Sequence, residues 1–426
     1  MRLLIACASL GIALGCGSDE ATTSATPTDP PPTQPPAPEP PVDAPTLPLP
    51  IGIEPCSVMS EQELALREGD AARAGALTAT SNGYAVAYFA GANPKPWFGV
   101  CALDGSEMIA PITLPTGTTD PNAATLTLTD SGIIFGYTAM RSNLRRVLAR
   151  RPLPNLAEED IAAVELTATG LVLTQRAAGG ALAAWEERTG LNAATTISWA
   201  PIRADGQRSA PAQEVPDAGG ARFPAWSLPA RPDVTDRVLA YAVPTGGGLH
   251  DLRFRVHSGD GLGPEHVLAE DVPLQDGPHA VRFAGENKGT LFAWTEVEGN
   301  QSQIYLKHAT DDGVSRYGVQ TGGGSGERIR RTAARLIAFD QAVILFFVAT
   351  SLAPNGTVTD RSIRSQLLHP WGEPLARDQV SILYSSDDTL TMLRSTPSFE
   401  PGFAALSFEV LSDASSSTRL LTLRCR

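Results

Sequence analysis

Apolar runs of one form recur along the chain. Each run begins with a small or turn residue, continues with mostly apolar residues and ends on an aromatic residue. The seven terminal aromatic residues are Tyr88, Tyr137, Trp185, Tyr241, Trp294, Phe346 and Phe408. They are 49, 48, 56, 53, 52 and 62 residues apart. A nearly constant period of this length is typical of the blades of a propeller.

Turn signals divide each repeat into short strands. Asp-Gly pairs ending at Gly105, Gly206, Gly261 and Gly313 stand between apolar runs, which is a strong hairpin signal. Runs such as 342–348 are apolar on consecutive residues, as in a strand that is buried on both faces. One such run alone fits a core helix equally well, but seven copies punctuated by hairpin turns favour strands.

The repeats predict an all-β domain over 56–426, a seven-bladed β-propeller whose blades are four-stranded antiparallel sheets. The period and the hairpins resemble those of the secreted or lipid-anchored propellers of bacteria. The resemblance covers the whole repeat region and singles out no one family.

The C-terminus ends on a segment that matches the third strand of a blade. We therefore expect residues 60–70 to supply the missing outer strand, because a closed ring leaves no open sheet edge. In this register Cys425 corresponds to Cys101, and Cys56 falls near Asp104. A Cys56–Cys425 disulfide is the prediction for an exported chain, with Cys101 a buried thiol. Free thiols and a Cys56–Cys101 pairing are the alternatives.

Residues 1–15 predict a secretory signal: Arg2 precedes an apolar run, and polar residues follow. The segment from Ala13 to Cys16 resembles a lipobox, which implies that Cys16 is the lipid-attachment residue of a bacterial lipoprotein. By the same resemblance, Gly17 favours the outer membrane of a Gram-negative cell. A plain secreted protein is the alternative.

Residues 16–55 predict a disordered, Pro-rich tether, with thirteen prolines between Pro27 and Pro55. At about 3.1 Å per residue, such a segment reaches on the order of 100 Å from a membrane.

Composition narrows the range of partners. The 426 residues carry a net charge of -13, which disfavours nucleic acid because phosphate binding needs a cationic surface. Four of the six histidines fall between His250 and His279, but their spacing is not that of a zinc or iron site. We predict no cofactor and no metal, and we expect a monomer.

Other candidate motifs are incomplete. The Gly-rich segments 244–248 and 321–327 lack the Lys-Ser/Thr ending of a phosphate loop, and Ser325 lacks the second Gly of a nucleophile elbow. The Asp-Gly turns only partly resemble the Asp-box of sialidases, so no catalytic residue can be assigned from it. Acidic residues follow several of the aromatic residues, at Glu186, Glu187, Glu296 and Glu409. They are interpreted as general charged surface.

Arginines cluster at 141–151 and 328–335. They are interpreted as solvated strand edges, with a patch for an anionic ligand such as an acidic polysaccharide as the alternative. The resulting hypothesis is a non-enzymatic, lipid-anchored surface propeller that binds a protein or glycan. A sialidase-like glycoside hydrolase or a lyase is the alternative. Carboxylates from several blades that cluster with Arg or Tyr at one end of the central axis, together with turnover of a glycan, would favour the hydrolase or lyase.

Overall fold

The domain is built from short strands. A computed structural model describes residues 56–64, 73–91, 93–114, 117–152, 158–164, 167–188, 190, 193–231, 233–259, 261–285, 288–299, 301–313, 315–321, 328–339, 342–375, 380–412 and 416–425. The predicted signal and tether, including Cys16, lie outside these residues. Strands, turns and bends make up the described part of the chain, which contains no α-helix.

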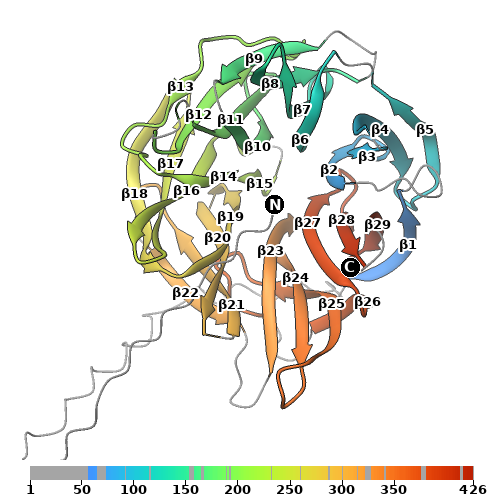
Figure 1. Cartoon of the computed structure of the whole chain (residues 1–426). Helices are drawn as coiled ribbons and strands as arrows, with labels where there is room; N and C mark the ends of the chain where they lie inside the picture. The colour runs from blue at the N-terminus through green and yellow to red at the C-terminus, as the bar shows by residue number, and fades with distance from the viewer. Residues whose placement is uncertain are drawn as a thin grey trace, which may run out of the picture. The chain divides into compact units, whose positions relative to one another are not determined.

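Seven sheets are arranged in a ring (Figure 1), as the repeats predict. Blade one comprises β2 (Arg73–Thr80), β3 (Gly83–Ala90), β4 (Lys95–Ala102) and β5 (Glu107–Thr113). Blade two comprises β6 (Thr119–Thr129), β7 (Gly132–Arg141), β8 (Leu144–Arg150) and β9 (Glu159–Val164). Blade three comprises β10 (Thr167–Gln175), β11 (Ala181–Arg188), β12 (Thr196–Ile202) and β13 (Gln213–Glu214). Blades four and five comprise β14 (Arg222–Trp226), β16 (Arg237–Gly246), β17 (Leu249–Ser258), β18 (Gly261–Val272); and β19 (Leu274–Phe283), β20 (Gly289–Glu298), β21 (Gln301–Ala309), β22 (Ser315–Thr321). Blades six and seven comprise β23 (Ile329–Phe339), β24 (Ala342–Leu352), β25 (Val358–Leu368), β26 (Val380–Ser386); and β27 (Thr389–Pro397), β28 (Phe403–Leu411), β29 (Ser416–Arg424), β1 (Ser57–Glu63).

The first strand of each blade is the innermost one. Each innermost strand packs against its counterpart in the next blade, in the order β2, β6, β10, β14, β19, β23, β27 and back to β2. The short strand β15 (Leu228–Pro229) adds a parallel edge to β19 and lies near the centre of the ring (Figure 1). Seven innermost strands therefore surround one axis.

The apolar core lies between blades. On β24, Val343, Leu345 and Phe347 pack in the cluster shared with blade five. The intervening Ile344 and Phe346 pack in the cluster shared with blade seven. This alternation explains the consecutive apolar residues, because both faces of a central strand are buried.

The aromatic residue that repeats in blade six is Phe347, one residue beyond the predicted Phe346. Phe347 packs toward the preceding blade, as Trp294 and Tyr241 do in blades five and four. The sequence pattern could not separate two adjacent phenylalanines. Burial on opposite faces of one strand separates them.

Closure follows the predicted scheme, with a shifted register. β1 pairs antiparallel with β29, and Ser57 lies opposite Arg424. In Figure 1, β1 runs beside the C-terminal blade. Among described residues the closing strand is Ser57–Glu63, which begins before the expected segment 60–70. Arg424 lies opposite Phe403, as Ala102 lies opposite Gly83. Cys425 therefore matches the residue after Ala102, two positions beyond Cys101.

A disulfide joins Cys56, just before β1, to Cys425, just after β29. The bond links residues 369 positions apart at the seam of the ring. Cys101 is free and buried, as expected. The β1–β29 pairing and the disulfide therefore join the two ends of the ring at the same place, in blade seven.

A β-bulge interrupts each of the seven innermost strands at a similar position. The register shifts lie at Arg73/Ala76, Asn122/Thr125, Thr169/Val172, Arg222/Ala225, Asp276/His279, Thr332/Arg335 and Thr391/Arg394. A left-handed backbone accompanies five of them, at Ala123, Gly170, Phe223, Ala333 and Met392. A bulge redirects the side chains that follow it, and such bulges occur often next to functional sites.

Loss of the disulfide should destabilise the ring. A Cys56→Ser, Cys425→Ser variant should lose about 2–4 kcal/mol of unfolding free energy in urea, because the unfolded chain is no longer cross-linked. Under reducing conditions the variant and the wild type should unfold alike. Non-reducing peptide mapping should recover the Cys56–Cys425 pair. A Cys56–Cys101 peptide would contradict the register.

Candidate functional site

Three basic side chains from consecutive blades meet next to the axis. His279, Arg335 and Arg394 are the residues that end the bulges of β19, β23 and β27. All three are half-buried. We call these three residues the axial cationic cluster.

The two guanidinium groups share one acceptor. Arg335 Nε donates to the carbonyl oxygen of Leu393 at 2.8 Å, and Arg394 Nη1 donates to the same oxygen at 3.2 Å. Arg335 Nη1 also donates to the carbonyl of Ala334 at 2.6 Å. A guanidinium has five N–H donors. Each arginine therefore keeps several N–H groups beyond these bonds.

Within the described residues, no carboxylate lies within ion-pair distance of either guanidinium. The charge of Asp276 acts on Arg335, and that of Glu409 acts on Arg394. Asp276 Oδ2 accepts the backbone N–H of Ala333 at 2.8 Å, which holds this carboxylate on the bulge of the next blade. Two like charges therefore lie side by side, and the charges of Asp276 and Glu409 compensate them without an ion pair among the described residues.

Desolvation dominates the electrostatics of the cluster. Burial, and secondarily the charge of Arg394, lowers the pKa of Arg335 to about 9, so its guanidinium stays charged at neutral pH. Burial also lowers the pKa of Arg394. The pKa of His279 lies well below its ordinary value because of burial and the charges of both arginines. The imidazole is therefore neutral at pH 7.

The tautomer of His279 follows from one hydrogen bond. Its Nδ1 accepts the backbone N–H of Leu336 at 3.1 Å. A neutral imidazole whose Nδ1 is an acceptor carries its proton on Nε2. His279 therefore presents a hydrogen-bond donor, like the two arginines.

The other sequence candidates are placed elsewhere. In the 141–151 cluster, Arg141 pairs with Glu158 and Asp160, and Arg145 pairs with Asp120 at 2.5 Å. These contacts agree with the interpretation as charged strand edges. In the 328–335 cluster, Arg335 alone belongs to the axial cationic cluster.

The remaining histidines do not meet in one place. His257 packs edge-on against Trp199 and Trp226, whereas His266 stacks on Phe254. No group of three or more potential metal ligands occurs among the described residues. Nor does any helix in the described ranges have the length and apolar character needed to cross a bilayer.

The acidic residues after the repeat aromatics have local partners. Glu187 accepts the indole N–H of Trp185 at 2.8 Å, and Glu296 accepts that of Trp294 at 2.6 Å. Glu186 accepts the backbone N–H of Phe223 at 2.6 Å, across to the next blade. These carboxylates therefore fix strands rather than forming a separate acidic site.

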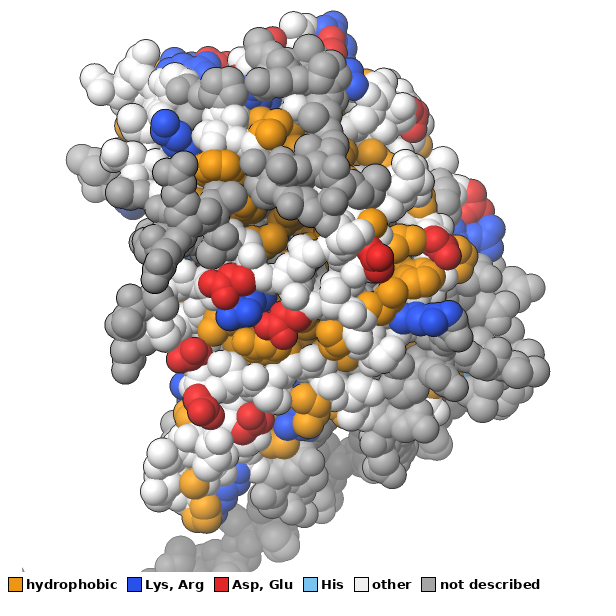
Figure 2. Space-filling model, turned by 90° about the vertical axis from the view of Figure 1, so that its right-hand side faces the viewer, with side chains coloured by type: hydrophobic (Ala, Val, Ile, Leu, Met, Phe, Trp, Pro, Cys, Tyr) orange, Lys and Arg blue, Asp and Glu red, His pale blue; other side chains and the backbone are white. Residues whose placement is uncertain are grey.

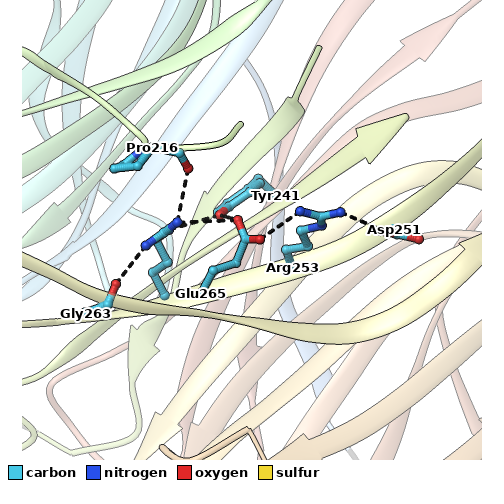
Figure 3. A network of polar contacts seen from close by, with 7 residues as sticks. Pro216, Tyr241, Asp251, Arg253, Gly263 and Glu265 are labelled. Atoms are coloured by element: carbon cyan, nitrogen blue, oxygen red, sulfur yellow. Dashed lines mark hydrogen bonds and ion pairs between the residues drawn. The ribbon is translucent and has the colours of Figure 1, made fainter. Parts of the chain in front are cut away.

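A second charged network crosses blade four (Figure 3). Tyr241 donates to Glu265 at 2.6 Å, and Arg253 bridges Glu265 and Asp251 at 2.7 and 3.0 Å. Arg255 donates to the carbonyls of Gly263 and Pro216. Burial and the neighbouring Glu265 raise the pKa of Tyr241, so its hydroxyl keeps its proton. The charges of this network are paired with one another, which favours a structural role.

The outer surface offers no comparable concentration of one charge on the face that is visible in Figure 2. Acidic, basic and apolar side chains are interspersed there. That face is the right-hand side of Figure 1, where β1, β4 and β5 lie. The two adjacent guanidinium groups at the axis thus contrast with the mixed surface of this part of the rim.

Comparison with known proteins supports the fold. No protein-family model and no curated protein matches the chain. The solved polysaccharide lyase Uly1 is similar with a TM-score of 0.51 and 8% identity, covering 82% of this chain and 89% of its own. The acylaminoacyl peptidase of Pyrococcus horikoshii is similar with a TM-score of 0.45 and 12% sequence identity. The match covers 82% of this chain and 52% of the peptidase. The chain thus spans about half of that peptidase. A thermostable family-43 glycoside hydrolase is similar with a TM-score of 0.34 and 10% sequence identity. The match covers 61% of this chain and 92% of the hydrolase.

The network in blade four should matter for stability. Arg255→Ala removes the donors to two backbone carbonyls and leaves Glu265 with less compensation, so we expect a loss of about 3 kcal/mol in urea unfolding. Tyr241→Phe removes one hydroxyl and should cost about 1 kcal/mol. Equal, negligible effects of both substitutions would contradict a structural role.

Proposed function

We propose that this chain is a lipid-anchored protein of the cell envelope whose propeller binds an anionic ligand at the axial cationic cluster. The observation that carries the proposal is the contact of Arg335 and Arg394 with one carbonyl oxygen, without an ion pair to any described carboxylate. The ligand can be borne by a protein or a glycan. Fold similarity alone assigns no function.

An anion suits the charge of this arrangement. Adjacent guanidiniums repel each other, and their burial removes favourable hydration. A carboxylate or sulfate between them accepts charge-assisted hydrogen bonds from both and offsets that repulsion. The Nε2–H of His279 supplies a further neutral donor.

Binding is favoured over catalysis by the state of the nearby groups. His279 holds its proton on the nitrogen that is available to a ligand, so this tautomer is a donor rather than a base. Asp276 is engaged with the backbone of the next blade. A glycoside hydrolase or lyase is the alternative function, because charged residues of several blades do meet at the axis. Glycan turnover that Arg335→Gln abolishes would establish it.

The proposal of a lipid anchor rests on the sequence. The leader, the lipobox-like segment ending at Cys16 and the Pro-rich stretch support attachment to a membrane with the propeller held away from it. Gly17 supports the outer membrane. No cofactor is required by this proposal.

Removal of either axial arginine should weaken anion binding. Arg335→Gln or Arg394→Gln should lower the affinity for inorganic sulfate at least about tenfold, because a charge-assisted hydrogen bond contributes about 1.5–3 kcal/mol. Isothermal titration calorimetry at constant ionic strength measures this effect. Arg141→Gln is the matched control and should change nothing, since Arg141 already pairs with two carboxylates. Equal sulfate binding by all four proteins would refute the site.

Cys16→Ala tests the anchor separately. The variant should move from the membrane fraction to the soluble fraction while its propeller unfolds at the same urea concentration as the wild type. Metabolic labelling with a fatty-acid analogue should mark the wild type only. Unchanged membrane partitioning of the variant would rule out attachment through Cys16.

A further inference from the structure

An exposed aromatic residue stands at the bulge of blade four. Phe223 lies on the innermost strand β14 and is 38% exposed, although most large apolar side chains of the domain are buried. The corresponding positions hold the small residues Ala123, Gly170, Gly277 and Ala333 in blades two, three, five and six, and Met392, which is 41% exposed, in blade seven. Phe223 is therefore the one aromatic residue at this bulge position in blades two to seven.

The backbone of Phe223 is strained. Its φ is 57°, a left-handed conformation that an aromatic residue rarely adopts. Glu186 of blade three holds the Phe223 N–H at 2.6 Å and stabilises this conformation. The same left-handed backbone occurs at this bulge position in blades two, three, six and seven, so blade four differs in the exposed aromatic side chain that it places there.

A glycine of the next blade makes room for the ring. A Cβ on Gly277 would lie 2.5 Å from Phe223 Cβ and 3.1 Å from its Cγ, closer than side chains approach. Phe223 thus lies directly against the innermost strand of blade five. Gly277 is two residues from His279 and adjacent to Asp276, so the aromatic residue and the axial cationic cluster occupy neighbouring innermost strands.

We propose that Phe223 is a stacking platform for a sugar ring, so that the ligand of the axial cationic cluster is an acidic oligosaccharide. This inference rests on the proposed anion site and names its ligand class. A pyranose presents C–H groups on one face, which pack on an aromatic ring, and its carboxylate suits a pair of guanidiniums. The innermost strand of blade five lies between that of blade four and that of blade six. A ligand that stacks on Phe223 and reaches Arg335 and Arg394 therefore has to extend past blade five, as an oligosaccharide of several units can.

A combined measurement on two probes separates this inference from the anion site. Wild type, Phe223→Ala and Phe223→Tyr are titrated with inorganic sulfate and applied to an array of uronate- and sialate-containing oligosaccharides. Phe223→Ala should lose about tenfold or more in affinity for the acidic oligosaccharides that the wild type binds, yet bind sulfate normally. Phe223→Tyr should retain both activities because its ring is equally flat.

Two further variants serve as controls. Gly277→Ala should displace the ring and reproduce the loss of oligosaccharide binding with normal sulfate binding. Phe399→Ala removes another exposed phenylalanine, on the turn between β27 and β28, and should change neither. Unfolding in urea verifies that each variant is folded.

Each outcome has one meaning. If the wild type binds sulfate but no acidic oligosaccharide, or if Phe223→Ala binds the oligosaccharides as the wild type does, the platform is refuted and the anion site stands. If Arg335→Gln binds sulfate as the wild type does, the anion site itself fails. Selective loss of oligosaccharide binding in Phe223→Ala and Gly277→Ala supports the inference.

Discussion

The pairing of β1 with β29 is the constraint on which the rest of the structure depends. Without it, blade seven lacks its outer strand, and the ring is no longer held at its two ends. With it, and with the Cys56–Cys425 disulfide at the same seam, the innermost strands pack around one axis. Residues more than fifty positions apart in sequence, such as His279 and Arg335, then become neighbours. The axial cationic cluster lies on three of these packed innermost strands, β19, β23 and β27.

The repeated bulge turns a nearly symmetric scaffold into an asymmetric site. The residue that ends the bulge is Ala76, Thr125, Val172 and Ala225 in blades one to four, and His279, Arg335 and Arg394 in blades five to seven. All seven innermost strands share the bulge, although the left-handed residue is found in five of them, and the side chain that follows the bulge differs between blades. Blades six and seven carry the positive charge of Arg335 and Arg394, blade five contributes the neutral imidazole of His279, and blade four contributes the exposed ring of Phe223.

The energetic character of the site differs from that of the other charged groups. In blade four, Arg253, Arg255 and Glu265 compensate one another and hold strands together. At the axis, Arg335 and Arg394 are placed side by side at a cost in desolvation and repulsion. The charges of Asp276 and Glu409 offset this cost only in part, because the pKa values of both arginines remain lowered.

The sequence predicted the fold in detail but only part of the site. The repeat period, the hairpin turns and the incomplete last blade were sufficient to predict seven blades and the Cys56–Cys425 disulfide. Both features depend on burial and chain connectivity, which the sequence pattern reveals. The sequence indicates Arg335 only as part of the arginine cluster 328–335. Arg394 and Phe223 gave no signal, because a bulge breaks the two-residue alternation that reveals which side chains share a face. Alignment of the repeats on the bulge would have revealed the change from small residues to His and Arg.

A crystal structure of the propeller grown with selenate tests the central claim most directly, since the anomalous signal of selenium locates the anion. The account predicts a peak within hydrogen-bond distance of both Arg335 and Arg394, close to the Nε2 of His279. The guanidiniums should keep their contacts with the carbonyl of Leu393. Selenate bound only elsewhere on the protein, with Arg335 and Arg394 paired to carboxylates such as Asp276 and Glu409, would contradict it.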